Sequence, residues 1–168
     1  MRFVLLLLMV LAATLPATAQ DVRSVDNLFV ADGLVYFNLR TGEAVPAAEK
    51  TETNWDILIN GVEIHANRGG QLLVAAFDDV AESPVEGMKR GLVKTADGEQ
   101  WYSYDMSTHV VTPKEGHTFV LMLADDSYAK LVVDSYYHRV TEDPRYLTFR
   151  YTIADDGSPV FGADGPGH

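Results

Sequence analysis

The 168-residue chain contains no cysteine. It therefore forms no disulfide, and it offers no thiol nucleophile. It also has no cysteine that could carry a lipid anchor. We expect packing alone to stabilise the fold.

Basic residues are scarce. Lysine and arginine number 13 against 24 aspartates and glutamates, which gives a formal net charge of -11. A field of this sign repels phosphate polymers, so nucleic acid and anionic membrane surfaces are poor partners. The acidity itself is best explained as keeping an exported protein soluble.

Long hydrophobic runs are confined to the amino-terminal end. One positive charge at Arg2 precedes an apolar run from Phe3 to Leu15, and Ala17-Thr18-Ala19 is a small-residue cleavage site. The pattern predicts a secretory signal peptide over 1–19, because a transmembrane span takes about 20 apolar residues. We expect an exported protein, periplasmic or secreted, with no transmembrane segment after signal removal. The remaining 149 residues fit one domain, and the loss of Arg2 moves the net charge to -12.

Sustained helical periodicity is also missing. Short runs rich in Val, Ile, Leu, Phe and Tyr alternate with Gly, Asp, Asn and Pro. The pattern predicts a single all-β, largely antiparallel domain over 20–158, either a sandwich or a partly open barrel. Residues 159–168, rich in Gly and Pro, are expected to form a flexible tail. Hairpin turns are predicted at Asp32-Gly33, Thr41-Gly42, Asn60-Gly61 and Asp125-Asp126.

Two segments give more local expectations. The stretch 145–157 alternates strictly and places Leu147, Phe149, Tyr151 and Ile153 on one face, which should close the core. In contrast, LLVAAF (72–77) fits a buried strand, and SPVEGMKRG (83–91) fits one helical turn with Ser83 as N-cap.

Motifs for catalysis are absent: the chain has no GxSxG and no HExxH. Ser103 and Ser107 lie near His109 in sequence, but a strand supplies neither a third orienting group nor an oxyanion hole. We therefore expect a binding protein and not an enzyme.

Pairs of aspartates occur at 78–79, 125–126 and 155–156. Calcium binds such oxygens, yet none of the pairs has the alternating spacing of a calcium loop. Because aspartates in turns cap local backbone amides, we interpret these pairs as turn residues.

Histidine and methionine are the remaining ligand types. They occur in the mature chain at His65, His109, His117, His138, His168, Met88, Met106 and Met122. Imidazole and thioether are axial ligands of haem iron, and a porphyrin also needs apolar walls. WYSYDMSTHVVTP (101–113) offers both, although a strand over Ser103–His109 would point Met106 and His109 to opposite faces. His109 could instead hydrogen-bond near Pro113 and fix a strand end, and Trp101 and Tyr104 are expected to fill the core or cover an edge. Composition alone does not select haem over another apolar ligand.

Several segments in order resemble the HmuY family of exported haem-binding proteins. They are VYFNLRTGEAV, TNWDILINGVEIHANRGG, WYSYDMSTHVVTP, YAKLVVDSYY and LTFRYTIADDGS, from about Val35 to Ser158. The resemblance implies an all-β fold and a haemophore-like role, in which haem is captured outside the cytoplasm and passed to an outer-membrane haem receptor. It also implies two axial side-chain ligands, histidines in some members and methionines in others.

Two features depart from the family. Many relatives are lipoproteins, whereas this chain has no anchoring cysteine, which indicates a soluble periplasmic or secreted form. The glycine loop carries His65, which is not typical and is either a private ligand or an incidental surface residue.

These arguments predict a protein that binds haem or a related tetrapyrrole. The expected iron ligands are one or two of His109, His117, His65, His138 and Met106, with His109 and His117 as the metal-binding pair. Basic side chains that could meet the propionates are Arg68, Lys89 and Arg90, because a guanidinium matches a carboxylate in bidentate geometry. The alternative is an extracytoplasmic protein- or glycan-interaction module on the same scaffold, without haem.

Overall fold

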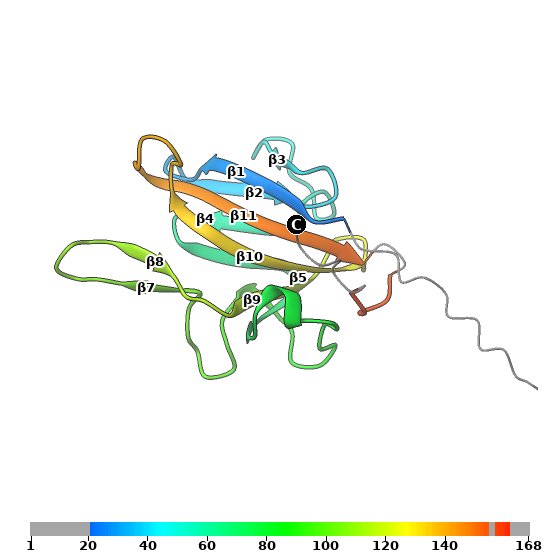
Figure 1. The fold of residues 1–168 in the computed structure, drawn as a ribbon. Coiled ribbons are helices and arrows are strands. Elements are labelled where there is room, and N and C mark those ends of the chain that lie inside the picture. Colours follow the sequence, from blue (N-terminus) through cyan, green and yellow to red (C-terminus); the bar gives the residue numbers. More distant parts are fainter. Residues whose placement is uncertain (1–20, 155–156, 162–168) are drawn as a thin grey trace, which may run out of the picture.

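Antiparallel strands form nearly all of the regular structure (Figure 1). The computed structural model describes residues 21–154 and 157–161. The expected signal peptide, Asp155-Asp156, His168 and residues 162–168 lie outside the described residues. The strands are β1 (Arg23–Phe29), β2 (Leu34–Asn38), β3 (Glu43–Val45), β4 (Ile57–Asn60), β5 (Glu63–Val74), β6 (Lys89–Leu92), β7 (Tyr102–Tyr104), β8 (Val111–Pro113), β9 (His117–Met122), β10 (Tyr128–Tyr137) and β11 (Pro144–Ala154). A short 3-10 helix, η1 (Phe77–Asp79), follows β5.

Nine strands build one curved sheet. Its order is β1-β11-β10-β9-β5-β4-β2-β3, with β6 paired to β5. Phe37 of β2 meets Phe149 of β11 edge to face at 5.5 Å, although their strands are not neighbours in the sheet. The sheet must therefore curl over its own core as an open half-barrel, whose edges are β1 and β3. This confirms the predicted all-β, largely antiparallel fold.

Strand β11 shows how the sequence pattern builds the core. Leu147, Phe149, Tyr151 and Ile153 are all buried on one face, as the alternation predicts. On the other face Thr148 is buried too, and its hydroxyl accepts a hydrogen bond from the Asn27 backbone N–H at 3.1 Å. Although β11 lies next to the edge strand β1, residues on both of its faces are therefore buried.

One buried carboxylate links two turns of the half-barrel. Asp56 precedes β4, and its oxygens accept hydrogen bonds from the Leu39 and Ala124 backbone N–H groups, each at 2.8 Å. The first N–H belongs to the turn after β2 and the second to the turn after β9. Burial raises the pKa of Asp56, while these two donors act in the opposite direction.

Most predicted turns join paired strands. The turns at Thr41-Gly42, Asn60-Gly61 and Asp125-Asp126 connect β2 to β3, β4 to β5 and β9 to β10. The hairpin predicted at Asp32-Gly33 is wrong, because β1 pairs with β11 and β2 with β3 and β4. That turn crosses from one side of the open half-barrel to the other, and it begins at the buried Val30.

Residues after β5 depart from the expected pattern. The predicted strand LLVAAF stops at Val74 and gives way to η1. The helical turn expected after Ser83 is absent: residues 85–87 form a bend, and β6 begins at Lys89. The Ser83 N–H donates to the Pro159 carbonyl at 2.8 Å. Phe161 is buried against this segment and its N–H donates to the Ala81 carbonyl at 2.8 Å. The expected tail therefore does not begin at Pro159.

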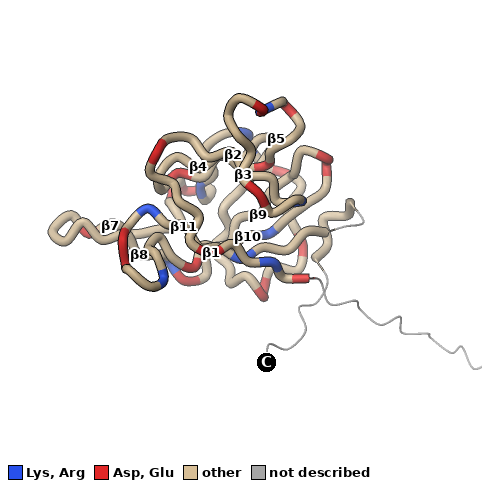
Figure 2. The backbone as a smooth tube through the Cα atoms, turned by 90° about the horizontal axis from the view of Figure 1, so that it is seen from above, with Lys and Arg blue, Asp and Glu red and all other residues tan. Residues whose placement is uncertain are grey.

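Strands β7 and β8 form a separate two-stranded sheet that projects from the body. We call residues 101–113 the arm, and it extends away from the sheet in Figures 1 and 2. Its base is fixed at two points. Buried Trp101 donates from Nε1 to the Val62 carbonyl at 2.8 Å, and the Val111 N–H donates to the Tyr137 hydroxyl at 2.9 Å.

Acidic positions recur around the described surface and do not gather in one place (Figure 2). Within residues 21–154 and 157–161, no helix is long and apolar enough to cross a membrane.

Candidate functional site

The outer half of the arm is a turn held by Asp105. The Asp105 N–H donates to the Val110 carbonyl at 2.9 Å, and the His109 N–H donates to the Asp105 carbonyl at 2.8 Å. Oxygen Oδ1 of Asp105 accepts the Ser107 N–H and hydroxyl, each at 2.7 Å. The Ser107 hydroxyl and then the backbone N–H groups hold the pKa of Asp105 at about 2, so this carboxylate stays ionised.

This turn changes the expected placement of the ligand residues. Strand β7 ends at Tyr104, so Ser103–His109 is not one strand. The strand considered over Ser103–His109 is therefore not formed, although Met106 and His109 still do not share a cavity. Trp101 fills the core as expected, whereas Tyr104 is 45% exposed and faces a cavity.

His109 is oriented by a neighbouring phenol. The Tyr104 hydroxyl and His109 Nδ1 lie 2.5 Å apart, and His109 has a left-handed φ of 60°. Nitrogen Nε2 of His109 makes no hydrogen bond with any residue that the structure describes. A histidine that binds a metal through one nitrogen usually hydrogen-bonds through the other. His109 therefore keeps one ring nitrogen without a protein partner among the described residues.

A cavity of about 460 Å³ lies between the arm and the body, and we call it the arm cavity. It takes side chains from the arm, from β10 and from the start of β11. The lining residues are Val62, Tyr102, Tyr104, His109, Val111, Tyr136, Pro144 and Arg145. Aromatic and apolar walls with a few polar groups are typical of small-molecule sites.

A second cavity of about 480 Å³ adjoins the first, and we call it the loop cavity. Both cavities share Val62, Tyr136 and Arg145. The loop cavity adds Glu63 and the turn residues around Gly33 and Gly61. Burial raises the pKa of the Tyr136 phenol, so it stays neutral at physiological pH.

His117 lies elsewhere. It is buried at the start of β9, with Nδ1 3.0 Å from the Glu115 carbonyl and Nε2 3.7 Å from a Glu99 carboxylate oxygen. It lines a different cavity, of about 440 Å³, together with Phe77, Asp134 and Arg150. The structure thus does not bring His109 and His117, the expected metal-binding pair, to one cavity.

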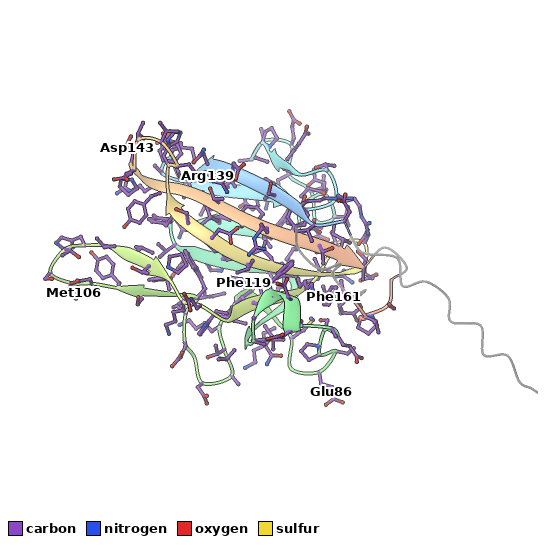
Figure 3. The ribbon with its side chains drawn as sticks, viewed as in Figure 1. Glu86, Met106, Phe119, Arg139, Asp143 and Phe161 are labelled. Carbon is purple, nitrogen blue, oxygen red and sulfur yellow. The ribbon has the colours of Figure 1, made fainter. Side chains whose placement is uncertain are left out.

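The other candidate ligands do not line the arm cavity either. His65 Nε2 contacts a Glu63 carboxylate oxygen at 3.2 Å. His138 Nδ1 accepts the Val140 and Thr141 N–H groups at 3.3 and 3.2 Å. Met106 is 76% exposed at the far end of the arm, as Figure 3 shows.

The basic residues expected to bind the propionates do not line the arm cavity either. Arg68 pairs with Asp126 at 2.7 Å, and Arg90 reaches the Asn67 side-chain oxygen at 3.5 Å. Lys89 lines a fourth cavity with Gly70 and Gln71. Sequence reasoning missed Arg145, whose only signal is its position directly after Pro144 at the start of a strand.

The acidic residues that the structure describes do not form a metal-binding site. Among the described residues, no group of three or more His, Asp or Glu side chains is placed to hold an ion. Asp125 accepts the Ser127 N–H at 3.1 Å, which confirms the turn interpretation for that pair.

Comparisons with known proteins identify the fold. No family profile and no curated protein matches the chain. Among solved structures, an apo HmuY analog from Tannerella forsythia is 17% identical with a TM-score of 0.58, covering 80% of this chain and 95% of its own. Apo PinO from Porphyromonas gingivitis is 14% identical with a TM-score of 0.58, covering 80% and 98%. A candidate HmuY-like heme-binding protein from Bacteroides vulgatus is 15% identical with a TM-score of 0.55, covering 83% and 94%.

Proposed function

We propose that this chain, which has the fold of the HmuY-like proteins, captures haem or a similar tetrapyrrole in the arm cavity. One observation carries the proposal: His109 lines an aromatic cavity, with Nδ1 held by Tyr104 and Nε2 available. The role is haemophore-like, so the ligand is bound and handed on without chemistry. We also propose that the protein is exported and that an outer-membrane haem receptor receives the ligand from it.

Capture rests on two contributions. The side chains of Tyr102, Tyr136 and Val111 remove the ring from water, and burial of apolar surface contributes about 25 cal/mol per Å². His109 Nε2 binds the iron. Because one imidazole lines the cavity, we expect a mainly high-spin ferric complex. Met106 lies in the same turn but outside the cavity lining, so we do not expect it to bind the iron.

The fold comparisons support haem as the ligand. The Bacteroides vulgatus protein is described as heme-binding, and the Tannerella forsythia protein as an HmuY analog in its apo form. The cavity in this chain has the size range and lining of small-molecule sites. Its one unengaged imidazole nitrogen is the ligand type that haem iron accepts.

Replacing His109 with Ala tests the proposal. We expect the wild-type mature protein to give a saturable Soret band at one equivalent of hemin. The His109→Ala variant should lose affinity by roughly 100-fold or more, because the metal bond is lost while the apolar walls remain. The measurement is a hemin titration followed in the visible spectrum, in the ferric and the ferrous state.

Met106→Ala is the matched control, since it alters the same turn without altering the cavity lining. It should keep the one-to-one stoichiometry and most of the affinity. If His109→Ala titrates as the wild type does, His109 is not the ligand. If the wild type gives only featureless, non-saturating absorption, the proposal fails and a protein- or glycan-binding role takes its place.

A further inference from the structure

Arg145 is singular among the arginines of the described residues. The guanidinium of every other arginine there has a hydrogen bond or an ion pair with a carboxylate, carbonyl, amide or hydroxyl oxygen; these are Arg23, Arg40, Arg68, Arg90, Arg139 and Arg150. In residues 21–154 and 157–161, no hydrogen bond or ion pair involves the Arg145 guanidinium. In a chain with 24 acidic residues, an arginine whose guanidinium has neither a hydrogen bond nor an ion pair is unexpected.

The backbone fixes Arg145 in place. The residue has φ of 72°, in the left-handed region that non-glycine residues rarely occupy. Its carbonyl accepts the Val30 N–H at 2.9 Å, and the preceding Pro144 pairs with Tyr137 of β10. Such strain persists where the surrounding structure imposes it, and it concentrates at functional sites. The position of Arg145 is therefore set by two strands and not by an ion pair.

The guanidinium borders both cavities at the base of the arm. Arg145 lines the arm cavity and the loop cavity, and its charge acts on the neighbouring Tyr136 phenol. The acidic residue in the loop cavity is Glu63, whose carboxylate already contacts His65 at 3.2 Å and Asn60 at 3.5 Å. The arm cavity has no acidic lining residue. A cation thus faces an apolar cavity without a resident anion.

We propose that Arg145 recognises a free carboxylate of the ligand. The inference rests on the proposed function and deepens it. The arm supplies the metal ligand, and β11 supplies the cation for an acidic substituent of the ring. A guanidinium binds a carboxylate through two parallel hydrogen bonds, which favours ligands with free carboxylates over neutral esters of the same ring. The preferred ligand class is accordingly a metalloporphyrin with free carboxylates.

The test compares hemin with hemin dimethyl ester, which has the same ring and iron but no free carboxylate. The wild-type protein should bind hemin roughly 10- to 100-fold more tightly than the ester, the range expected for hydrogen bonds to a charged group. In Arg145→Gln that preference should fall to less than about threefold, because hemin affinity drops while ester affinity is retained.

Arg145→Asn is the second variant, since asparagine tolerates a left-handed φ better than other residues and removes the same charge. Both variants should behave alike, which separates loss of the guanidinium from a change in backbone strain. Arg145→Lys should restore part of the preference through charge alone. The wild-type comparison itself requires no variant to fold.

The outcomes distinguish this inference from the proposed function. If the wild type binds neither compound, the proposed function fails. If the wild type binds both equally, or if the variants keep the wild-type preference, the site binds a porphyrin and Arg145 does not recognise its carboxylates. If the variants weaken hemin and ester by the same factor, Arg145 supports the cavity without reading the carboxylate, and the inference is overturned.

Discussion

The Tyr104 hydroxyl and His109 Nδ1 are 2.5 Å apart in an exposed turn, where most side-chain hydrogen bonds compete with water. If Nδ1–H donates to the phenol oxygen, the lone pair of Nε2 is left for a metal. In that tautomer the contact also fixes the direction of the ring before any ligand arrives. Tyr104 therefore acts as a positioning residue for the proposed ligand.

Removing only the hydroxyl should expose this role. We expect Tyr104→Phe to lose roughly tenfold in hemin affinity, the lower end of the effect of second-sphere partners, because the aromatic wall remains while the imidazole is no longer held. The ferric–ferrous midpoint potential should also shift upward, since the histidine becomes a weaker donor. Measuring hemin affinity and midpoint potential together checks this.

The control for Tyr104 is Tyr102→Phe, which removes the hydroxyl of another tyrosine in the same cavity. That variant should leave the potential unchanged. A Tyr104→Phe protein with wild-type affinity and potential would show that the contact does not act on the metal site.

At this scale the sequence predicts residue types better than their partners. His109 was identifiable because histidine is a haem ligand beside aromatic residues. Tyr104 as its partner was not, since the turn that brings residue 104 next to residue 109 depends on Asp105 capping backbone groups. Arg145 was missed because its role is inferred from a guanidinium without an ion pair beside a cavity. A sequence shows neither the ion pairs nor the cavities.

The arm is the element on which the proposed function depends. Its base is built into the body by Trp101 and Tyr137, whereas its turn is held by Asp105 and by local backbone hydrogen bonds. The pKa of about 2 means that Asp105 loses its charge only in strong acid, so the turn keeps its cap across the pH range of a hemin titration.

Removing that cap should loosen the turn without unfolding the body. In Asp105→Ala we expect amide exchange at Ser107 and His109 to accelerate by roughly tenfold or more, because Ser107 N–H loses its acceptor. Hemin affinity should fall while the thermal unfolding midpoint changes little. Hydrogen exchange by NMR and a hemin titration on the same protein measure both effects.

Asp105→Asn is the companion variant, since its side-chain oxygen can still accept the Ser107 N–H. It should retain most of the protection of the Ser107 and His109 amides against exchange, and most of the hemin affinity. Unchanged exchange in Asp105→Ala would mean that the backbone alone maintains the turn.

Elements with regular alternation were predicted correctly, and those without it were not. Strand β11 and the turns at Asn60-Gly61 and Asp125-Asp126 follow from side-chain period and turn chemistry. The helical turn after Ser83 does not form, and the residues around Ser83 instead pair with Pro159 and Phe161 near the end of the described chain. Local cap signals cannot anticipate a partner from a distant part of the chain.

At the scale of the whole molecule, Asp56 is the polar link between distant turns of the half-barrel. Replacing it with Ala leaves the Leu39 and Ala124 N–H groups without their acceptor. We expect Asp56→Ala to lower the free energy of unfolding by roughly 2–4 kcal/mol, from two unsatisfied backbone donors. Urea unfolding followed by tryptophan fluorescence measures the loss.

The cost of this substitution should depend on pH. A raised pKa means that the native state keeps the Asp56 proton after the unfolded chain has released it, so the stability contributed by this group is full at low pH and decreases above about pH 4. Asp56→Ala should therefore be more destabilising at pH 4 than at pH 7. Equal losses at both values would contradict a raised native pKa.

The sequence identified the fold class but not the strand pairing. Alternation and turn residues suffice for an all-β, antiparallel chain. They do not reveal that β1 joins β11 while β2 joins β4, because this depends on how a curved sheet covers its core. The same long-range closure lets the Val30 N–H donate to the Arg145 carbonyl, and both residues line the loop cavity beside the proposed site.

The base of the arm is fixed to the body, whereas its turn is held by local contacts. This difference affects how the sequence of such a protein can change during evolution. Trp101 lies in the core, so mutations there are selected for stability, whereas Met106 contributes almost nothing to packing. A mutation in the turn that changes or removes the proposed metal ligand should therefore cost little folding free energy. Ligand preference in this architecture can therefore evolve in a handful of exposed positions while the half-barrel that presents them is inherited unchanged.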